Sequence, residues 1–114
     1  IASVDDLDLI ETHDCFTSTE YVAIDHFGLT EPGQSWKAVE SGELEIGGRV
    51  AMNPSGGLIG GGHPVGATRV RMLLDCHRQV TKAADGYQVP DATTAATLNI
   101  GGSMTTVVSF VVGA

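Results

Sequence analysis

The sequence predicts an α/β domain: a mixed sheet with helices packed on it, ending in a β-hairpin. Residues 93–100 and 104–112 are rich in Thr, Val and Ala, as strands are, and small residues join them in a tight turn. Apolar residues recur at helical spacing between Pro64, which suits the first turn of a helix, and Ala84. The order strand, helix, loop, helix, strand, strand is that of a mixed α/β layer.

The first half of the chain contains shorter elements. Residues 6–12 are expected to form a strand, because acidic residues bracket an apolar centre. Hydroxyl residues that can cap a helix open an expected helix over residues 17–27, which Gly28 ends. A short helix over 36–41 and an extended segment over 49–53 follow. Spacing predicts that the inner faces of the two longer helices hold Tyr21, Ile24, Phe27, Val70, Leu73, Leu74, His77 and Val80.

Composition narrows the classes of function. With 42% hydrophobic and 18% charged residues, the chain suits one packed domain rather than a disordered segment. Its formal charge of −8 disfavours binding to nucleic acid and to anionic membranes, and no apolar run suits a transmembrane helix. Cys15 and Cys76 form neither a C-x-x-C motif nor a disulfide framework, so we expect reduced thiols, a cytoplasmic protein and no metal site. Cys76 is expected to be a packing residue.

Three short segments are expected to meet at the strand ends, where ligands bind in open α/β sheets. In Gly61–Gly66, glycines let the backbone approach a ligand, and His63 can act as a base near neutral pH. Pro64 then starts a helix whose free N–H groups point at the site. A glycine loop with an incidental solvated histidine is the alternative.

The second segment is His13-Asp14-Cys15-Phe16, at the end of the first strand. A thiol two residues from an imidazole can serve as acid or base when its pKa is tuned. A buried structural cysteine beside a surface histidine is the alternative. The third segment is Asn99–Gly102, whose glycines allow a backbone N–H to face a developing oxyanion, although a plain hairpin turn has the same composition.

These segments resemble motifs of one enzyme family. The string N-P-S-G-G-L-I-G-G-G-H-P-V-G-A-T at Asn53–Thr68 resembles the C-terminal signature of thiolases. H-D-C-F at His13–Phe16 resembles the sterol-carrier-protein type, where classical thiolases have N-E-A-F, and Asn99–Gly102 resembles the classical C-x-G-G. The resemblance covers essentially the whole chain. It implies an incomplete thiolase-fold C-terminal half, in which residues 1–114 lack the first strand and helix of that half and the whole N-terminal half.

The resemblance also implies roles for individual residues. His63 would activate the nucleophilic cysteine, which belongs to the N-terminal half, and help polarise a thioester carbonyl. His13 would orient the first oxyanion site, and the Gly101 N–H would complete the second. Cys15 would transfer the α-proton in place of the classical cysteine, whose position is Asn99 here. The pantetheine arm would run along Ser55, Gly56 and Gly57.

The implied activity is that of an acyl-CoA C-acyltransferase, a thiolase that cleaves a 3-oxoacyl-CoA or forms one by Claisen condensation, in lipid or sterol side-chain metabolism. Acyl-CoA is the expected substrate, no further cofactor is expected, and the full-length protein is expected to be a homodimer or larger. Arg69 departs from the family's glycine and could narrow the site or pair with a ligand phosphate. Two other functions stay open: a thiolase-like retro-aldolase of steroid-type thioesters, and a module that binds acyl-CoA or a partner without turnover.

Overall fold

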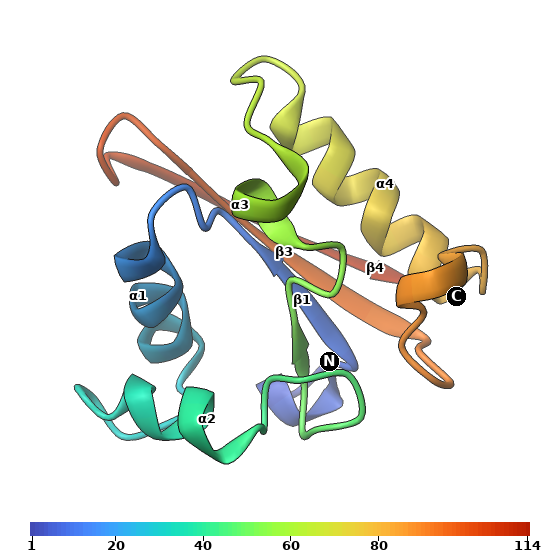
Figure 1. The fold of residues 1–114 in the computed structure, drawn as a ribbon, viewed down its shortest axis with the longest axis horizontal. Coiled ribbons are helices and arrows are strands. Elements are labelled where there is room, and N and C mark those ends of the chain that lie inside the picture. Colours follow the sequence, from blue (N-terminus) through green and yellow to red (C-terminus); the bar gives the residue numbers. More distant parts are fainter.

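The computed structural model describes all 114 residues of the chain (Figure 1). Its strands are β1 (Leu9–Thr12), β2 (Ala51–Met52), β3 (Thr94–Gly101) and β4 (Thr106–Gly113). Its α-helices are α1 (Thr17–Phe27), α2 (Ser35–Ser41), α3 (Gly57–Gly61) and α4 (Thr68–Val80), and two 3-10 turns cover Val4–Asp6 and Asp85–Tyr87.

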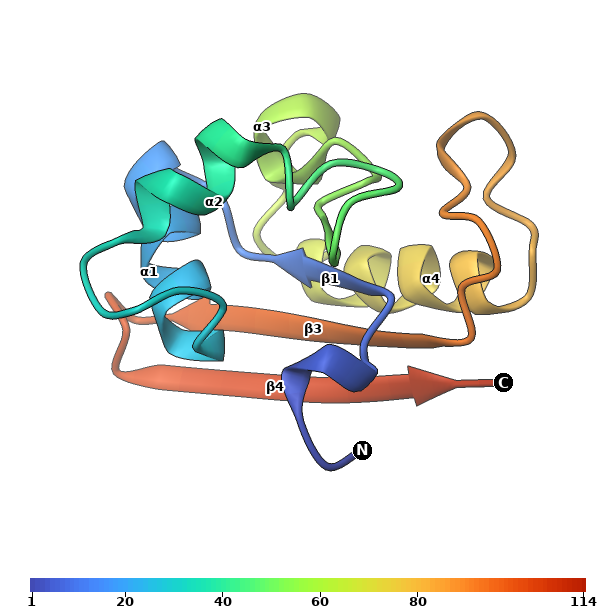
Figure 2. The ribbon, with the colours of Figure 1, turned by 90° about the horizontal axis from the view of Figure 1, so that it is seen from below.

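The four strands form one mixed sheet in the order β2-β1-β3-β4. β1 is parallel to both of its neighbours, with Leu9 beside Ala51 on one side and Ala95 on the other. β3 and β4 pair antiparallel along their whole length and lie side by side as a long terminal hairpin (Figure 2). The predicted mixed sheet ending in a β-hairpin is therefore confirmed.

Helices cover the sheet on opposite faces, with α1 and α2 on one face and α4 on the other (Figure 1). Successive side chains of β1 point to opposite faces of the sheet, so this strand contributes to the core on each face. Ile10 packs with Ile24 and Leu29 on the α1 side. Leu9 packs with Cys76 and Val80 on the α4 side. All four residues of β1 are buried, including the polar pair Glu11 and Thr12. A polar side chain buried in a central strand needs a partner, and these partners build the site described below.

The predicted inner face of α4 is wrong for Val70, Leu74 and His77, and it is confirmed for Val80. Val70 is 69% exposed and His77 is also exposed, whereas Met72, Cys76 and Val80 face the core. The buried face also contains Thr68, Asp75 and Gln79, which a search for apolar spacing does not count. Gln79 is buried because its amide bonds with Tyr87, Gln88 and Val89.

Other differences are local. Tyr21 was expected on the inner face of α1 but is 41% exposed. The first strand is shorter than expected because Ser3 caps a 3-10 turn over Val4–Asp6, and α3 lies within the predicted glycine loop. No helix combines the length and the hydrophobicity needed to cross a membrane.

Candidate active site

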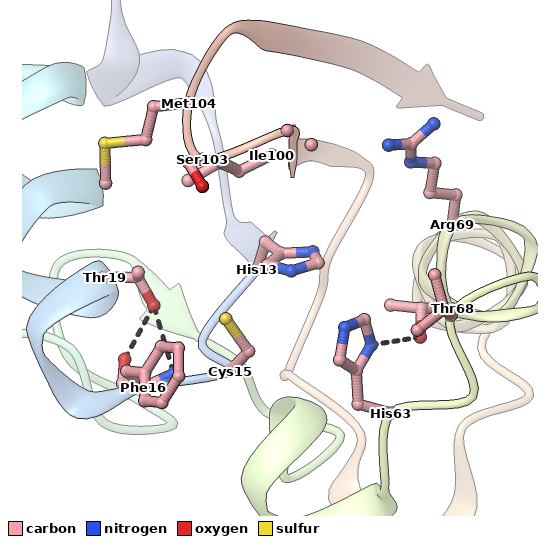
Figure 3. A pocket seen from close by; sticks show the side chains of 13 residues that line it. His13, Cys15, Phe16, Thr19, His63, Thr68, Arg69, Ile100, Ser103 and Met104 are labelled. Carbon is pink, nitrogen blue, oxygen red and sulfur yellow. Dashed lines mark hydrogen bonds between the residues drawn. The ribbon is translucent and has the colours of Figure 1, made fainter.

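A cavity of about 510 Å³ opens where β1 and β3 end (Figure 3). Its wall brings together His13 from the end of β1, His63 from the loop before α4, and Gly101 from the β3–β4 hairpin. Cys15 lines the same cavity, and in Figure 3 its sulfur points into the space below His13. The other lining residues are Phe16, Thr19, Val65, Thr68, Arg69, Ile100, Gly102, Ser103 and Met104.

The segment after β1 turns sharply and is held at both ends. His13 N–H donates to Leu98 O at 2.9 Å, which continues the sheet, and Asp14 N–H folds back onto Thr12 O at 3.0 Å. The Asp14 carboxylate is buried and accepts a 2.6 Å hydrogen bond from the Leu58 N–H of α3. These contacts leave Cys15 half-buried between His13 and the start of α1.

Two partly buried pairs of residues connect the glycine loop to the end of β1. The Asn53 side chain accepts from Thr12 N–H at 2.7 Å and donates to its hydroxyl at 3.0 Å. The Glu11 carboxylate accepts from Ser55 N–H at 3.1 Å and from its hydroxyl at 2.7 Å. The loop therefore cannot move without breaking hydrogen bonds to a central strand.

Two further contacts fix the path of the loop toward His63. Gly57 has a φ of +60°, and a methyl group there would collide with the Asp14 carboxylate, so only glycine fits. The Arg71 guanidinium donates to the carbonyls of Gly57 at 2.9 Å and Gly62 at 3.0 Å. The Arg71 side chain therefore bridges two points of the loop, and one of them is Gly62, the residue before His63.

Ser55, Gly56 and Gly57 do not line the cavity. The Ser55 hydroxyl is engaged with Glu11, and Gly57 is buried against Asp14. Their contact with a pantetheine arm stays a prediction, while their position shows a second role, which is to set the conformation of the loop.

The Thr68 hydroxyl lies within hydrogen-bond distance of both Pro64 O and His63 Nδ1. The Thr68 hydroxyl donates its single proton to Pro64 O at 3.1 Å and lies 2.7 Å from His63 Nδ1 (Figure 3). In this arrangement Nδ1 carries the hydrogen, which it donates to Thr68. The other ring nitrogen, Nε2, then has a free lone pair, as a general base requires.

The two imidazoles meet edge to face, with ring centroids 4.8 Å apart and an interplanar angle of 89°. Burial lowers the pKa of His13, and positive charge on His63 and Arg69 lowers it further, while Asp14 opposes the change. His13 is therefore neutral near pH 7, so it can donate a hydrogen bond without carrying a charge.

Asn99 lies beside His13, because it follows Leu98, the partner of Thr12 in the parallel pair. It is buried and does not line the cavity. Its amide donates to Thr97 at 3.1 Å, while its oxygen has no protein partner, and His13 Nδ1 is likewise buried without one. In the sequence, position 99 was noted only because asparagine stands there in place of the cysteine of classical thiolases.

The second cysteine is no candidate for the chemistry. Burial raises the pKa of the Cys76 thiol to about 12, and the nearby carboxylates Glu11 and Asp75 add to the effect. Cys76 is fully buried in the core between the sheet and α4, which confirms its predicted packing role.

Sequence reasoning missed three residues that support this site. Thr68 orients His63, Glu11 holds the loop through Ser55, and Arg71 spans the loop. The signal for Glu11 was available, since an acidic residue in a strand that is otherwise apolar needs a buried partner. Thr68 ends the thiolase-like string, but the string did not predict its contact with His63, and nothing in the spacing distinguished Arg71 from an ordinary helical residue.

Comparisons with known proteins agree with this architecture. A family model described as "Thiolase C-terminal domain-like" matches residues 2–114. The chain is 43% identical over 96 residues to sterol carrier protein 2 of Bos taurus, covering 84% of this chain and 18% of that protein. It is 40% identical over 98 residues to an acetyl-CoA acetyltransferase of Methanothermobacter thermautotrophicus, covering 86% and 26% respectively.

Among solved structures, a chain of an Ltp2-ChsH2(DUF35) aldolase superposes with a TM-score of 0.86 at 24% identity. The alignment covers 98% of this chain and 28% of that one, and at this identity the likeness establishes the fold. The chain thus spans about a quarter or less of the curated relatives it matches. On the match of the family model, this chain belongs to the thiolase C-terminal domain-like family.

Proposed function

We propose that residues 1–114 supply the acid/base and oxyanion groups of a thiolase, an acyl-CoA C-acyltransferase that cleaves or forms 3-oxoacyl-CoA. The supporting observation is the cavity that His13, Cys15 and His63 share although they come from separate segments. The proposal includes a nucleophilic cysteine outside these residues, a cytoplasmic homodimer or larger oligomer, and a place in lipid or sterol side-chain metabolism.

In the proposed thiolysis, the nucleophilic cysteine loses its proton to His63 Nε2 and attacks the 3-oxo carbon of the substrate. The bond between C2 and C3 breaks, leaving an acyl-enzyme and the carbanion of a shorter acyl-CoA. Cys15 gives its thiol proton to this carbanion and becomes a thiolate. Coenzyme A then gives its thiol proton to the Cys15 thiolate and takes the acyl group from the nucleophilic cysteine. The thiolate of the nucleophilic cysteine recovers its proton from His63, which restores all three groups.

The environment of each group suits its proposed task. In the proposed arrangement Thr68 donates to Pro64 O and accepts from His63 Nδ1–H, so Nε2 is available as the base. Neutral His13 and the Gly101 N–H are the proposed donors to the two developing oxyanions, where charge stabilisation has the largest effect on rate. Cys15 is half-buried beside the cavity, whose lining also includes Phe16, Ile100 and Met104.

The test is thiolysis of acetoacetyl-CoA and of longer 3-oxoacyl-CoA by the full-length protein and its Cys15→Ala and His63→Ala variants. We expect each variant to lose at least about a hundredfold in kcat/KM. Cys76→Ala is the matched control, because it removes a thiol outside the cavity. Wild-type kcat/KM in both variants would refute the assigned roles.

The same assay separates the two other functions. Thiolysis requires coenzyme A as acceptor, whereas retro-aldol cleavage of a 3-hydroxyacyl thioester proceeds without it. A protein that binds acyl-CoA with no turnover in either reaction would be a binding module.

A further inference from the structure

Arg69 is the one permanently charged side chain in the lining of the cavity. No aspartate or glutamate lines that cavity, although acidic residues outnumber lysine and arginine by 14 to 6 in the chain. A cation in a cavity without a carboxylate favours the binding of an anion there.

The other arginines all have partners within the chain. Arg49 pairs with Asp5 at 2.6 Å, and Arg71 and Arg78 each lie 3.7 Å from Asp75. Arg69 makes no hydrogen bond and no ion pair with any residue of the chain. Within residues 1–114 its donors are free for a ligand, and a guanidinium can bind a carboxylate with two parallel hydrogen bonds.

The position of Arg69 places such a ligand close to the reacting atoms. Arg69 is the second residue of α4, and its side chain extends to the β3–β4 hairpin (Figure 3). A methyl group on Gly101, the proposed oxyanion donor, would lie 2.6 Å from Arg69 Nη2. The charge of Arg69 also contributes to the lowered pKa of His13, so its field reaches the imidazole pair.

An acyl-CoA has anionic phosphates and can also have a carboxylate on its acyl chain, and the position of Arg69 indicates which of these it can reach. The phosphates of coenzyme A are separated from the thioester by the whole pantetheine arm, so they lie far from a group beside Gly101. A carboxylate on the acyl chain lies only a few bonds from the reacting carbonyl and can reach Arg69. The cavity, at about 510 Å³, is within the usual range for a small-molecule site.

We propose that Arg69 binds a carboxylate carried by the acyl group, so that the substrates are 3-oxoacyl-CoAs whose acyl chain ends in a carboxylate. The proposal rests on the thiolase function above and adds the substrate class. Arg69 is a specificity residue under this proposal, because it contacts the substrate and takes no part in proton transfer.

The test compares two six-carbon substrates, 3-oxoadipyl-CoA, which ends in a carboxylate, and 3-oxohexanoyl-CoA, which ends in a methyl group. We expect the full-length wild-type protein to favour the former by at least about tenfold in kcat/KM. Arg69→Met should lose about 10- to 100-fold on 3-oxoadipyl-CoA, mainly through KM, and stay within about threefold on 3-oxohexanoyl-CoA.

Two further variants sharpen the result. Arg69→Lys keeps the charge without the two-pronged geometry and should restore part of the preference. Arg78→Met, on the same helix but outside the cavity, should leave the ratio between the substrates unchanged.

Equal kcat/KM for the two substrates in the wild type would overturn the inference. An equal loss on both substrates in Arg69→Met would overturn it too, since it would place Arg69 at the thioester oxygen. Failure to cleave either substrate in the presence of coenzyme A would instead refute the thiolase function itself.

Discussion

Glu11 has the most unusual carboxyl group in the structure, and replacing it with glutamine gives a quantitative test. Its side chain is fully buried in β1 and accepts two hydrogen bonds from Ser55. Burial raises its pKa from 4.5 to about 7, while the bonds from Ser55 and the charge of Arg71 only partly oppose the change. The neutral acid is therefore the form that the folded protein prefers over most of the acidic range.

The sign of the pH dependence follows from linkage. Because the pKa is higher in the folded than in the unfolded state, the folded state binds more protons between pH 4.5 and about 7. The stabilisation that the protonated Glu11 gives to the folded state is complete below pH 4.5. It is lost as the pH rises through about 7. One pKa unit corresponds to about 1.36 kcal/mol, so the loss amounts to roughly 3 kcal/mol.

Glutamine keeps the shape of Glu11 but cannot ionise, so Glu11→Gln should remove this loss. We expect the variant to be more stable than the wild type by up to roughly 3 kcal/mol at about pH 8, and to differ little at about pH 4.5. The assay is denaturant unfolding of the full-length protein at both pH values. Glu31→Gln, which replaces an exposed carboxylate, is the control and should not change the free energy of unfolding at either pH.

A variant that is less stable than the wild type at about pH 8 would refute this reasoning. It would mean that Glu11 is ionised there and that its charge strengthens the bonds to Ser55 by more than burial costs.

Two other predictions concern the tautomer of His63 and the glycine loop. Thr68→Val removes the acceptor for His63 Nδ1–H, so the nucleophile should be acylated about tenfold or more slowly in stopped-flow experiments; an unchanged acylation rate would show that Thr68 does not set the tautomer. Gly57→Ala should lower the free energy of unfolding by about 1–3 kcal/mol, because alanine is strained at a φ of +60° and meets the Asp14 carboxylate. Gly60→Ala, where a methyl group meets nothing within 4 Å, is the control, and equal effects of the two substitutions would contradict the role of Gly57.

The sequence was sufficient for features that depend on local composition. The richness of residues 93–100 and 104–112 in Thr, Val and Ala predicted β3 and β4. The motifs at His13–Phe16 and Asn53–Thr68 located three of the residues that share a cavity. Such features follow from neighbours in the chain, so a single sequence contains them.

The sequence was insufficient where polar residues are buried. Gln79 and Asp75 occupy the inner face of α4 because residues that follow the helix, among them Tyr87 and Val89, satisfy their hydrogen bonds. Apolar spacing therefore assigned His77 to the core, although it is exposed. The same kind of contact explains why the role of Glu11 became visible only once Ser55 was placed beside it.

The central claim is that Cys15 transfers the α-proton while His63 serves the nucleophile, and isotope exchange tests it most directly. In deuterated water the full-length wild-type protein should introduce deuterium at the α-carbon of acetyl-CoA. It should also exchange labelled coenzyme A into acetyl-CoA, which requires the nucleophile but no carbanion. Cys15→Ala should slow the first reaction by at least about a hundredfold and the second by no more than about threefold. Deuterium uptake at the wild-type rate in Cys15→Ala would contradict the account.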